Sequence, residues 1–463
     1  MSVSIGSETP RSEMNSRWET VAWSIGQIAV QIYRDVPSLL LLFFMTQVLG
    51  ISPALAGTAI FGPKLVVAVL ADIGAGWLSD RLRQGKRRVR LILAGALLSP
   101  VFLILLFQAP SASTESGRAL YVALILSAYM LVFSLFSVPH LAIGTEVSDD
   151  RDTRTAAMAW RTAMSGVGLL VAASLAPILV GRFGGGADGY AAMAYVLAGL
   201  CAVTLVVAWA GSRSIDNRRV GADDVAAANA STGDTDGPDW RSIVRNRAAI
   251  GLMMAFFSQL CAMGMAYATL AYLFTFNLAF ARPLETIGIM VLLTSVMAIG
   301  IQPLWVSAAR RIGRRNVYVI GLLGYTAALL VIAFAPSQNA PWIYVGGLLM
   351  GMFQSACFTS AFSMLADVIE NDRLALGRSR AGLFSALFSI IDKTGFALGG
   401  TLLVGLLLET SGFIAGQAVQ TDNAMFGIAI GFALAPALLN AFSLGLIWFV
   451  YPAERQSPAV VAP

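Results

Sequence analysis

Charged residues are scarce in this 463-residue chain. They make up 12% of it, and the mean hydropathy is +0.73, whereas an average soluble domain contains about 25% charged residues. Roughly 20 consecutive apolar residues span a bilayer, and the chain has many runs of that length. These runs are longer and more continuous than the ~10-residue alternating strands of an outer-membrane barrel. We therefore expect an all-α integral membrane protein.

Cysteine is also rare, and a secretion signal is lacking. The three cysteines, Cys201, Cys261 and Cys357, lie within apolar runs, so we expect free core thiols and no disulfide framework. The first twenty residues are polar and contain no short apolar stretch, which argues against a cleavable signal peptide. The net charge of +5 does not indicate nucleic acid, because the basic residues gather in short turns between apolar runs.

Twelve apolar runs fall into two sets of six. The first set is 21–48, 53–78, 89–108, 119–143, 157–181 and 189–211, and the second is 248–277, 284–307, 316–335, 341–366, 381–408 and 424–451. The segment between the sets is rich in Asp, Ala, Gly, Ser and Thr, and it cannot bury enough apolar surface to fold alone. We predict two six-helix bundles (21–211 and 248–451), a flexible linker (212–247) and two cytoplasmic terminal segments (1–20 and 452–463).

The distribution of lysine and arginine orients the chain. With the N-terminus inside, the outer loops carry only Arg118, Arg182 and Arg282, and most of the 31 basic residues lie on the cytoplasmic side. The positive-inside rule therefore predicts that both termini are cytoplasmic. The expected location is the plasma membrane, in a bacterium the inner membrane.

A basic turn occurs at corresponding places in the two halves. Residues 76–88 read GWLSDRLRQGKRR, and residues 305–315 read WVSAARRIGRR, with the same spacing from tryptophan to glycine. The copies are unequal, because Asp80-Arg81 in the first becomes Ala308-Ala309 in the second. Such duplication is common in secondary transporters.

These motifs resemble the major facilitator superfamily. The first basic turn is similar to that superfamily's signature between spans two and three. Three other segments resemble its glycoside–pentoside–hexuronide:cation symporter branch, the group of the melibiose carrier: 144–155 after span four, 366–384 before span eleven, and 393–400 within span eleven. The resemblance covers essentially the whole chain. It implies a major facilitator fold of two pseudo-symmetric bundles, and alternating-access transport of a small sugar-like solute without enzymatic activity.

The charged turns are candidates for a conformational latch. An aspartate beside arginines can form charge-assisted contacts with helix ends in one state and release them in another. We also expect the acidic runs 146–152 and 367–372 to pair with the basic turns. The alternative is that the arginines only fix topology and bind lipid phosphates. The predicted latch residues are Gly76, Asp80, Arg81, Arg87, Arg88, Glu146, Asp150, Arg154, Asp367 and Arg380.

Asp72 is the strongest candidate for coupling, because ionisable groups within spans are costly unless they have a function or a partner. The resemblance implies four acidic positions, which align here with Gln31, Ala68, Asp72 and Ser137, and only Asp72 is acidic. Sodium prefers several oxygen ligands, whereas a proton needs one carboxylate. We therefore expect coupling to protons rather than sodium through Asp72, Lys393 and Ser137, with no metal or other cofactor. The alternative is structural pairing of Asp72 with Lys64 or Lys393.

The predicted substrate-binding residues are Gln31, Arg34, Asp35, His140 and Arg161. Gln31 and Asp35 are one turn apart on one helix face, and Arg161 aligns with a substrate-contacting arginine of the family. Arg34 and Asp35 are sequence neighbours that do not face each other on a helix, so we expect each to meet a different partner or to line the cavity. Basic residues at these places suit an anionic or amphipathic solute, although mutual neutralisation of the charges remains an alternative. The alternative for His140 is a hydrogen-bonded structural histidine, which is the commoner role of a lone histidine near the end of a span.

Other functions fit parts of the sequence. Three of the four acidic positions that bind sugar or sodium in the family are not acidic here. This leaves open a lipid or amphiphile carrier, or a transporter-like membrane assembly factor. The aspartates of 149–152 and 367–372 superficially resemble the acidic loops of membrane prenyltransferases. The duplicated twelve-span plan does not fit such an enzyme. The expected partners are a small solute, a coupling cation and membrane lipids, with no nucleic acid, and the expected state is a monomer.

Overall fold

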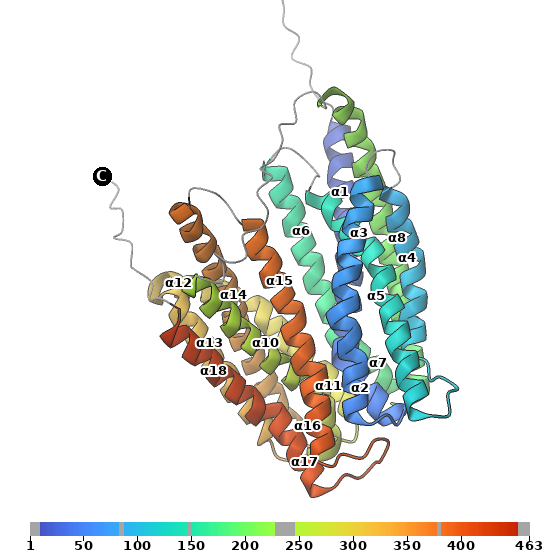
Figure 1. The fold of residues 1–463 in the computed structure, drawn as a ribbon, viewed down its shortest axis with the longest axis vertical. Coiled ribbons are helices and arrows are strands. Elements are labelled where there is room, and N and C mark those ends of the chain that lie inside the picture. Colours follow the sequence, from blue (N-terminus) through green and yellow to red (C-terminus); the bar gives the residue numbers. More distant parts are fainter. Residues whose placement is uncertain (1–9, 83–87, 146–150, 227–245, 377–380, 452–463) are drawn as a thin grey trace, which may run out of the picture.

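Every regular element in the described part of the chain is a helix (Figure 1). The computed structural model describes residues 10–82, 88–145, 151–226, 246–376 and 381–451. Twelve helical segments in these ranges are long and apolar enough to cross a membrane, at the places that hydropathy predicts. The helices are α1 (Pro10–Phe43), α2 (Pro53–Gly62), α3 (Ala68–Leu82), α4 (Arg88–Leu106), α5 (Glu115–Thr145), α6 (Arg151–Leu170), α7 (Ala176–Arg182), α8 (Ala187–Ala226), α10 (Arg247–Tyr272), α11 (Pro283–Gly300), α12 (Gln302–Ile312), α13 (Arg314–Ala333), α14 (Ala340–Leu376), α15 (Ala381–Ala397), α16 (Val404–Thr410), α17 (Asp422–Ala429) and α18 (Ala435–Phe449).

Four of the six π-helical turns in the described residues form matched pairs between the N-terminal half (α1–α8) and the C-terminal half (α10–α18). A π-helical turn ends the first span at Phe44–Val48, and another ends the seventh span at Leu273–Asn277. A second pair interrupts the fifth and eleventh spans at Val171–Leu175 and Leu398–Leu403. Such turns insert one extra residue into an α-helix and often mark functional places. Their matched positions are a structural trace of the duplication that the two basic turns indicate.

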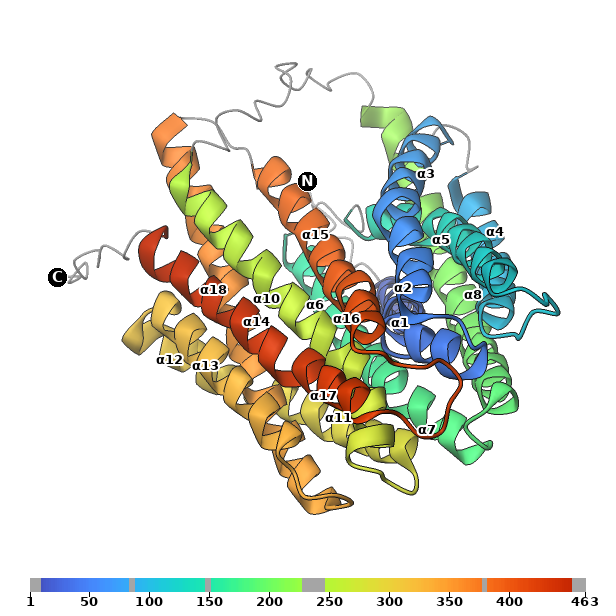
Figure 2. The same cartoon turned by 60° about the horizontal axis from the view of Figure 1, so that its bottom comes forward.

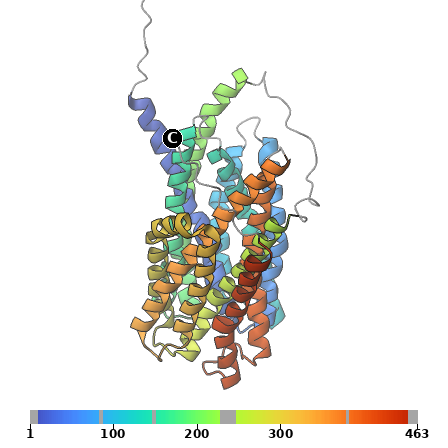
Figure 3. The same ribbon diagram turned by 90° about the vertical axis from the view of Figure 1, so that its left-hand side faces the viewer.

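The segment predicted as a flexible linker begins with a helix. Helix α8 continues through Ala226, and its end projects beyond most of the other helices (Figure 3). The predicted linker 212–247 is therefore helical over its first part, through Ala226. A helix that is already nucleated within a span extends at little cost through a sequence with no proline, and 212–226 has none. Residues 227–245 lie outside the described part.

The two halves contact each other near one end of the molecule. We call the end where α8 finishes and α10 begins the linker end. At the opposite end, α2 packs against α16, and α11 packs against α7 (Figure 1). The ribbons of the two halves diverge toward the linker end (Figure 2). The structure therefore holds the halves together at the end opposite the linker.

At the end opposite the linker, the backbones of the two halves approach closely and two hydrogen bonds join them. Gly57 of α2 lies against the Thr401 backbone, so that a methyl group at Gly57 would lie 2.6 Å from the Thr401 carbonyl oxygen. The hydroxyl oxygens of Thr46 and Tyr272 are 2.7 Å apart between the halves. The Ala54 amide donates to Glu409 Oε2 across the same interface at 3.3 Å.

Gly57→Ala is expected to shift the protein toward a state open at this end. Overpacking a tight contact costs about 1–3 kcal/mol, which corresponds to roughly a fivefold to hundredfold change in the equilibrium between states. The measurement is the labelling rate of a cysteine placed at Thr46, which is fully buried, in a protein whose native cysteines are also buried. Gly62→Ala on the same helix is the control, because a methyl group there meets nothing within 4 Å. Equal labelling of both variants would contradict the role of the Gly57 contact.

Candidate functional site

An ion pair joins the two halves through the second and eleventh spans. Lys393 Nζ of α15 lies 2.6 Å from Asp72 Oδ2 of α3, and the two side chains are 51% and 32% exposed. The Ser134 hydroxyl of α5 donates to the other carboxylate oxygen, Asp72 Oδ1, at 2.7 Å. Asp72 therefore has a partner from each half. The predicted coupling residues Asp72 and Lys393 meet here, and this is also the pairing named as the structural alternative.

The first span contributes a second charged pair. Arg34 Nε donates to Asp35 Oδ1 at 2.8 Å, and Gln31 Nε2 donates to Asp35 Oδ2 at 3.1 Å. Of the two alternatives predicted for Arg34 and Asp35, different partners was wrong, because the long arginine side chain folds back onto its neighbour. Gln31 and Asp35 share one helix face as predicted.

Further charges surround these two pairs. The Arg34 side chain is 59% exposed, and Asp392 lies within its electrostatic range. Asp392 also lies within electrostatic range of Asp35 and Lys393. Lys64 donates to Ser38 Oγ at 3.1 Å and lies within electrostatic range of Asp35. We call this set the charged cluster: Arg34, Asp35, Lys64, Asp72, Asp392 and Lys393.

The charged cluster is balanced, with three basic and three acidic side chains from both halves. The sequence named Lys64 only as a possible partner of Asp72, and it gave Asp392 no place in the site. The structure pairs Asp72 with Lys393 and Lys64 with Ser38. The available signal for Lys64 and Asp392 was their sequence position, because Asp392 directly precedes Lys393 and Lys64 lies about two helical turns before Asp72. What the sequence could not show is that spans one, two and eleven bring the six residues together.

Arg161 of α6 stands apart from these pairs. Its side chain is partly exposed, and it makes no hydrogen bond or ion pair with any residue that the structure describes. His140 is within its electrostatic range. An arginine within a span is costly without a partner. Arg161 is thus a cation that a ligand could pair with, as the sequence predicts for a substrate-binding residue.

His140 lies in the packed core of the N-terminal half and not on a binding surface. Its ring is 2% exposed and stacks on Trp23 and Phe136, with ring centroids 5.2 and 4.8 Å apart. Its Nδ1 atom is 3.1 Å from Ser212 Oγ. The predicted substrate-binding role is therefore corrected to the structural one, because both faces of the ring are covered by aromatic side chains.

A different serine from the predicted one contacts Asp72, the predicted coupling residue. Ser137 aligns with an acidic position of the family, but it makes no hydrogen bond in the part of the chain that the structure describes. Ser134, almost one turn earlier on α5, faces Asp72 instead. The aligned position lies on the correct helix, but the hydroxyl that reaches Asp72 belongs to Ser134 and not to Ser137.

Ser134→Ala is expected to reduce uptake about tenfold, because a hydrogen bond to a charged group contributes about 1.5–3 kcal/mol. Ser137→Ala is the matched control, with the same change on the same helix, and should leave uptake within twofold of wild type. Both rates can be measured in one reconstituted preparation. A larger loss for Ser137→Ala than for Ser134→Ala would show that the alignment, and not the described contact, identifies the coupling residue.

The predicted latch is only partly described. Arg87, Glu146, Asp150 and Arg380 lie outside the described residues, and Asp80 and Arg154 lie on helices whose side chains are not described at those positions.

The other predicted latch residues contact their own half. Arg81 lies over the Trp77 ring at 3.7 Å, and Gly76 of the same turn faces Val138. Arg88 is buried and donates to the Pro139 carbonyl oxygen. Asp367 of one acidic run pairs with Arg314 of the second basic turn within the C-terminal half, while the side chains of the other acidic run, 146–152, lie outside the described part. The latch between halves stays a prediction for the state in which the linker end closes.

Comparison with known proteins gives consistent matches over the whole chain. The family described as MFS/sugar transport protein matches residues 22–455. The "Glucuronide carrier protein homolog" of Escherichia coli (strain K12) is 26% identical, with 96% of this chain and 94% of that protein covered. The "Isoprimeverose transporter" of Lactiplantibacillus pentosus is 24% identical, with 96% and 90% covered. The crystal structure of the nucleoside transporter NupG shares the fold, with a TM-score of 0.64 at 17% identity and with 94% and 98% of the two chains covered.

Proposed function

The chain belongs to the MFS/sugar transport protein family, and from this premise we propose that it carries an anionic sugar-like solute together with a proton. It is a multi-pass membrane protein and a secondary transporter of sugar-like solutes, not an enzyme. The negative charge of the solute and the identity of the coupling ion are the two parts of the proposal. The ion pair between Asp72 and Lys393 is the observation that carries it.

An anionic solute suits the basic side chains near the interface of the halves. Arg161 has no described partner, and Arg34 presents an exposed guanidinium although Asp35 holds one of its nitrogens. Guanidinium groups bind carboxylates through two parallel hydrogen bonds, which gives both affinity and orientation. One relative is named for a glucuronide, which carries a carboxylate, while another is named for isoprimeverose, which is neutral. Arg161 favours the first class.

A proton suits Asp72 better than sodium does. Both carboxylate oxygens are already engaged, one by the Lys393 ammonium and one by the Ser134 hydroxyl. A sodium ion would have to displace the ammonium and gather further oxygen ligands, whereas a proton binds to one carboxylate oxygen and neutralises the group.

Neutralising Asp72 removes the attraction between α3 and α15. The ion pair then no longer ties the second span to the eleventh, and Lys393 becomes available to the solute or to Asp392. Alternating access requires the halves to rock about a central site. A contact between the halves that depends on one proton links that motion to the proton gradient.

Counterflow in liposomes tests the solute class. Vesicles loaded with unlabelled D-glucuronate or methyl β-D-glucuronide should accumulate the same labelled compound. Vesicles loaded with methyl β-D-glucoside, the neutral counterpart of the glycoside, should not accumulate labelled glucoside. Accumulation of the glucoside at an equal or higher rate would contradict the anionic assignment and leave the transporter assignment intact.

A further inference from the structure

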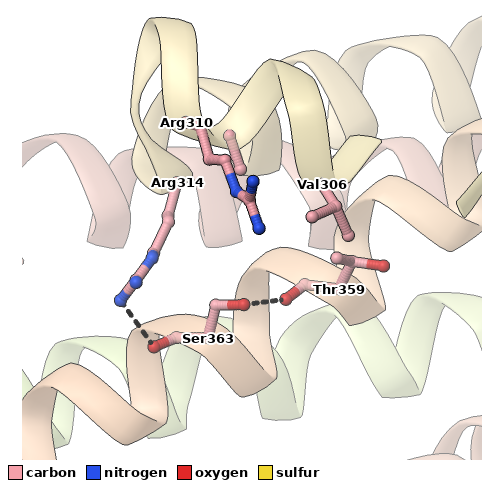
Figure 4. A pocket seen from close by; sticks show the side chains of 6 residues that line it. Val306, Arg310, Arg314, Thr359 and Ser363 are labelled. Carbon is pink, nitrogen blue, oxygen red and sulfur yellow. Dashed lines mark hydrogen bonds between the residues drawn. The ribbon is translucent and has the colours of Figure 1, made fainter. Parts of the chain in front are cut away.

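A crevice opens near the linker end of the C-terminal half, away from the charged cluster. Its volume is about 290 Å³, and it lies between α12, α13 and α14 (Figure 4). Arg310 and Arg314 point from the turn between α12 and α13 toward α14. The lining residues are Val306, Ala309, Arg310, Arg314, Thr359 and Ser363.

The crevice results from the difference between the two basic turns. In the first copy Arg81 lies over the ring of Trp77, which is 56% exposed. In the second copy the matching tryptophan, Trp305, is buried and donates to the Met352 carbonyl oxygen at 2.8 Å. Ala309 takes the place that Arg81 has in the first copy. A small side chain there leaves space, and the positive charge moves to the next position, Arg310.

Arg310 is the basic group that is available in this crevice. It is exposed and makes no hydrogen bond or ion pair with the residues that the structure describes. Arg314 donates to the Ser363 carbonyl oxygen at 3.3 Å and pairs with Asp367. The Ser363 and Thr359 hydroxyls donate to the Thr359 carbonyl and to Gln302 Oε1. The residues that line the crevice include two guanidinium groups and no carboxylate, and Arg310 is the one without a partner among the described residues, so the crevice suits an anionic group.

The position of the crevice favours a phosphate that belongs to a lipid. Helix α12 directly follows the membrane span Pro283–Gly300, and Arg314 begins the next span, Arg314–Ala333. The lining is thus at the boundary between hydrocarbon and water, where phospholipid phosphates lie. Leu304 and Ile312 of α12 are 58% and 45% exposed and offer apolar surface for acyl chains. We propose that this crevice binds the phosphate of an anionic phospholipid, with Arg310 as the principal contact.

Lipid titration of the full-length protein tests this site. The purified protein in a neutral detergent is titrated with phosphatidylglycerol, phosphatidylcholine or inorganic phosphate, and bound lipid is measured by native mass spectrometry. Arg310→Gln should weaken phosphatidylglycerol binding about tenfold, as expected for the loss of a charge-assisted contact. Arg311→Gln is the control, because it removes the same charge from the neighbouring position, which does not line the crevice.

A second variant separates the crevice from surface charge in general. Ala309→Met keeps every arginine and fills the space, so it should also weaken phosphatidylglycerol binding. Thermal unfolding of each variant checks that it is folded. Equal weakening by Arg310→Gln and Arg311→Gln would overturn the site in favour of diffuse surface attraction. Arg310-dependent binding of inorganic phosphate with no preference for phosphatidylglycerol would overturn the lipid assignment.

Discussion

Asp72→Asn should abolish accumulation of solute against its gradient while leaving exchange of solute across the membrane. With one coupled proton, a pH difference of two units supports about a hundredfold accumulation of the solute, since each unit corresponds to about 1.4 kcal/mol. Asparagine can still accept the Ser134 hydrogen bond, but it cannot bind the proton or form the ion pair with Lys393. The measurement is pH-driven uptake and counterflow in the same vesicles.

A double variant distinguishes coupling from structural pairing. If Asp72 only neutralises Lys393, the combination Asp72→Asn with Lys393→Gln removes both charges and should restore accumulation. If Asp72 carries the proton, the double variant stays unable to accumulate solute although no charge is left unpaired. Restored accumulation would show that the pair is structural and that the coupling group lies elsewhere.

Arg161→Gln should raise the KM for an anionic solute about tenfold to a hundredfold. A hydrogen bond between charged groups contributes about 1.5–3 kcal/mol, and Arg161 has no other described partner that would compensate for the loss. Arg161→Lys should recover only part of the affinity, because an ammonium lacks the two-pronged geometry of a guanidinium. The measurement is the concentration dependence of initial uptake rates.

The control for Arg161 removes the same charge elsewhere. Arg182 ends α7 at the end opposite the linker and is exposed. Arg182→Gln should leave the KM within twofold of wild type. If both variants change the KM equally, the effect comes from the general electrostatic field and not from a contact with the solute.

The sequence was sufficient to predict the twelve spans, because each apolar run must match the thickness of a bilayer. Helix ends were less predictable. Helix α14 runs to Leu376, well beyond the predicted end at 366, and α8 extends to Ala226. Beyond the membrane, the length of a helix depends on local helix propensity and packing. Hydropathy measures neither of these, so it does not predict where such a helix ends.

The site was predicted residue by residue with unequal success. Asp72 and Lys393 were both identified, but only the tertiary structure brings the second span against the eleventh. Ser134 was missed in favour of Ser137, because the family's acidic position aligns with Ser137, whereas the hydroxyl that reaches Asp72 lies almost one turn earlier on the same helix. His140 drew attention as the only histidine, yet stacking on Trp23 and Phe136 explains its presence. The sequence identifies residues that are rare in a membrane span, but only the packing shows which of them are buried and which are exposed.

The central claim is that one proton moves with each anionic solute molecule. Together, a proton and a monovalent anion carry no net charge. In vesicles containing a pH-sensitive dye, addition of the transported solute should therefore acidify the interior at the rate of uptake, and a membrane potential imposed with potassium and valinomycin should not change that rate. Uptake that requires sodium, or that proceeds without proton entry, would contradict the account.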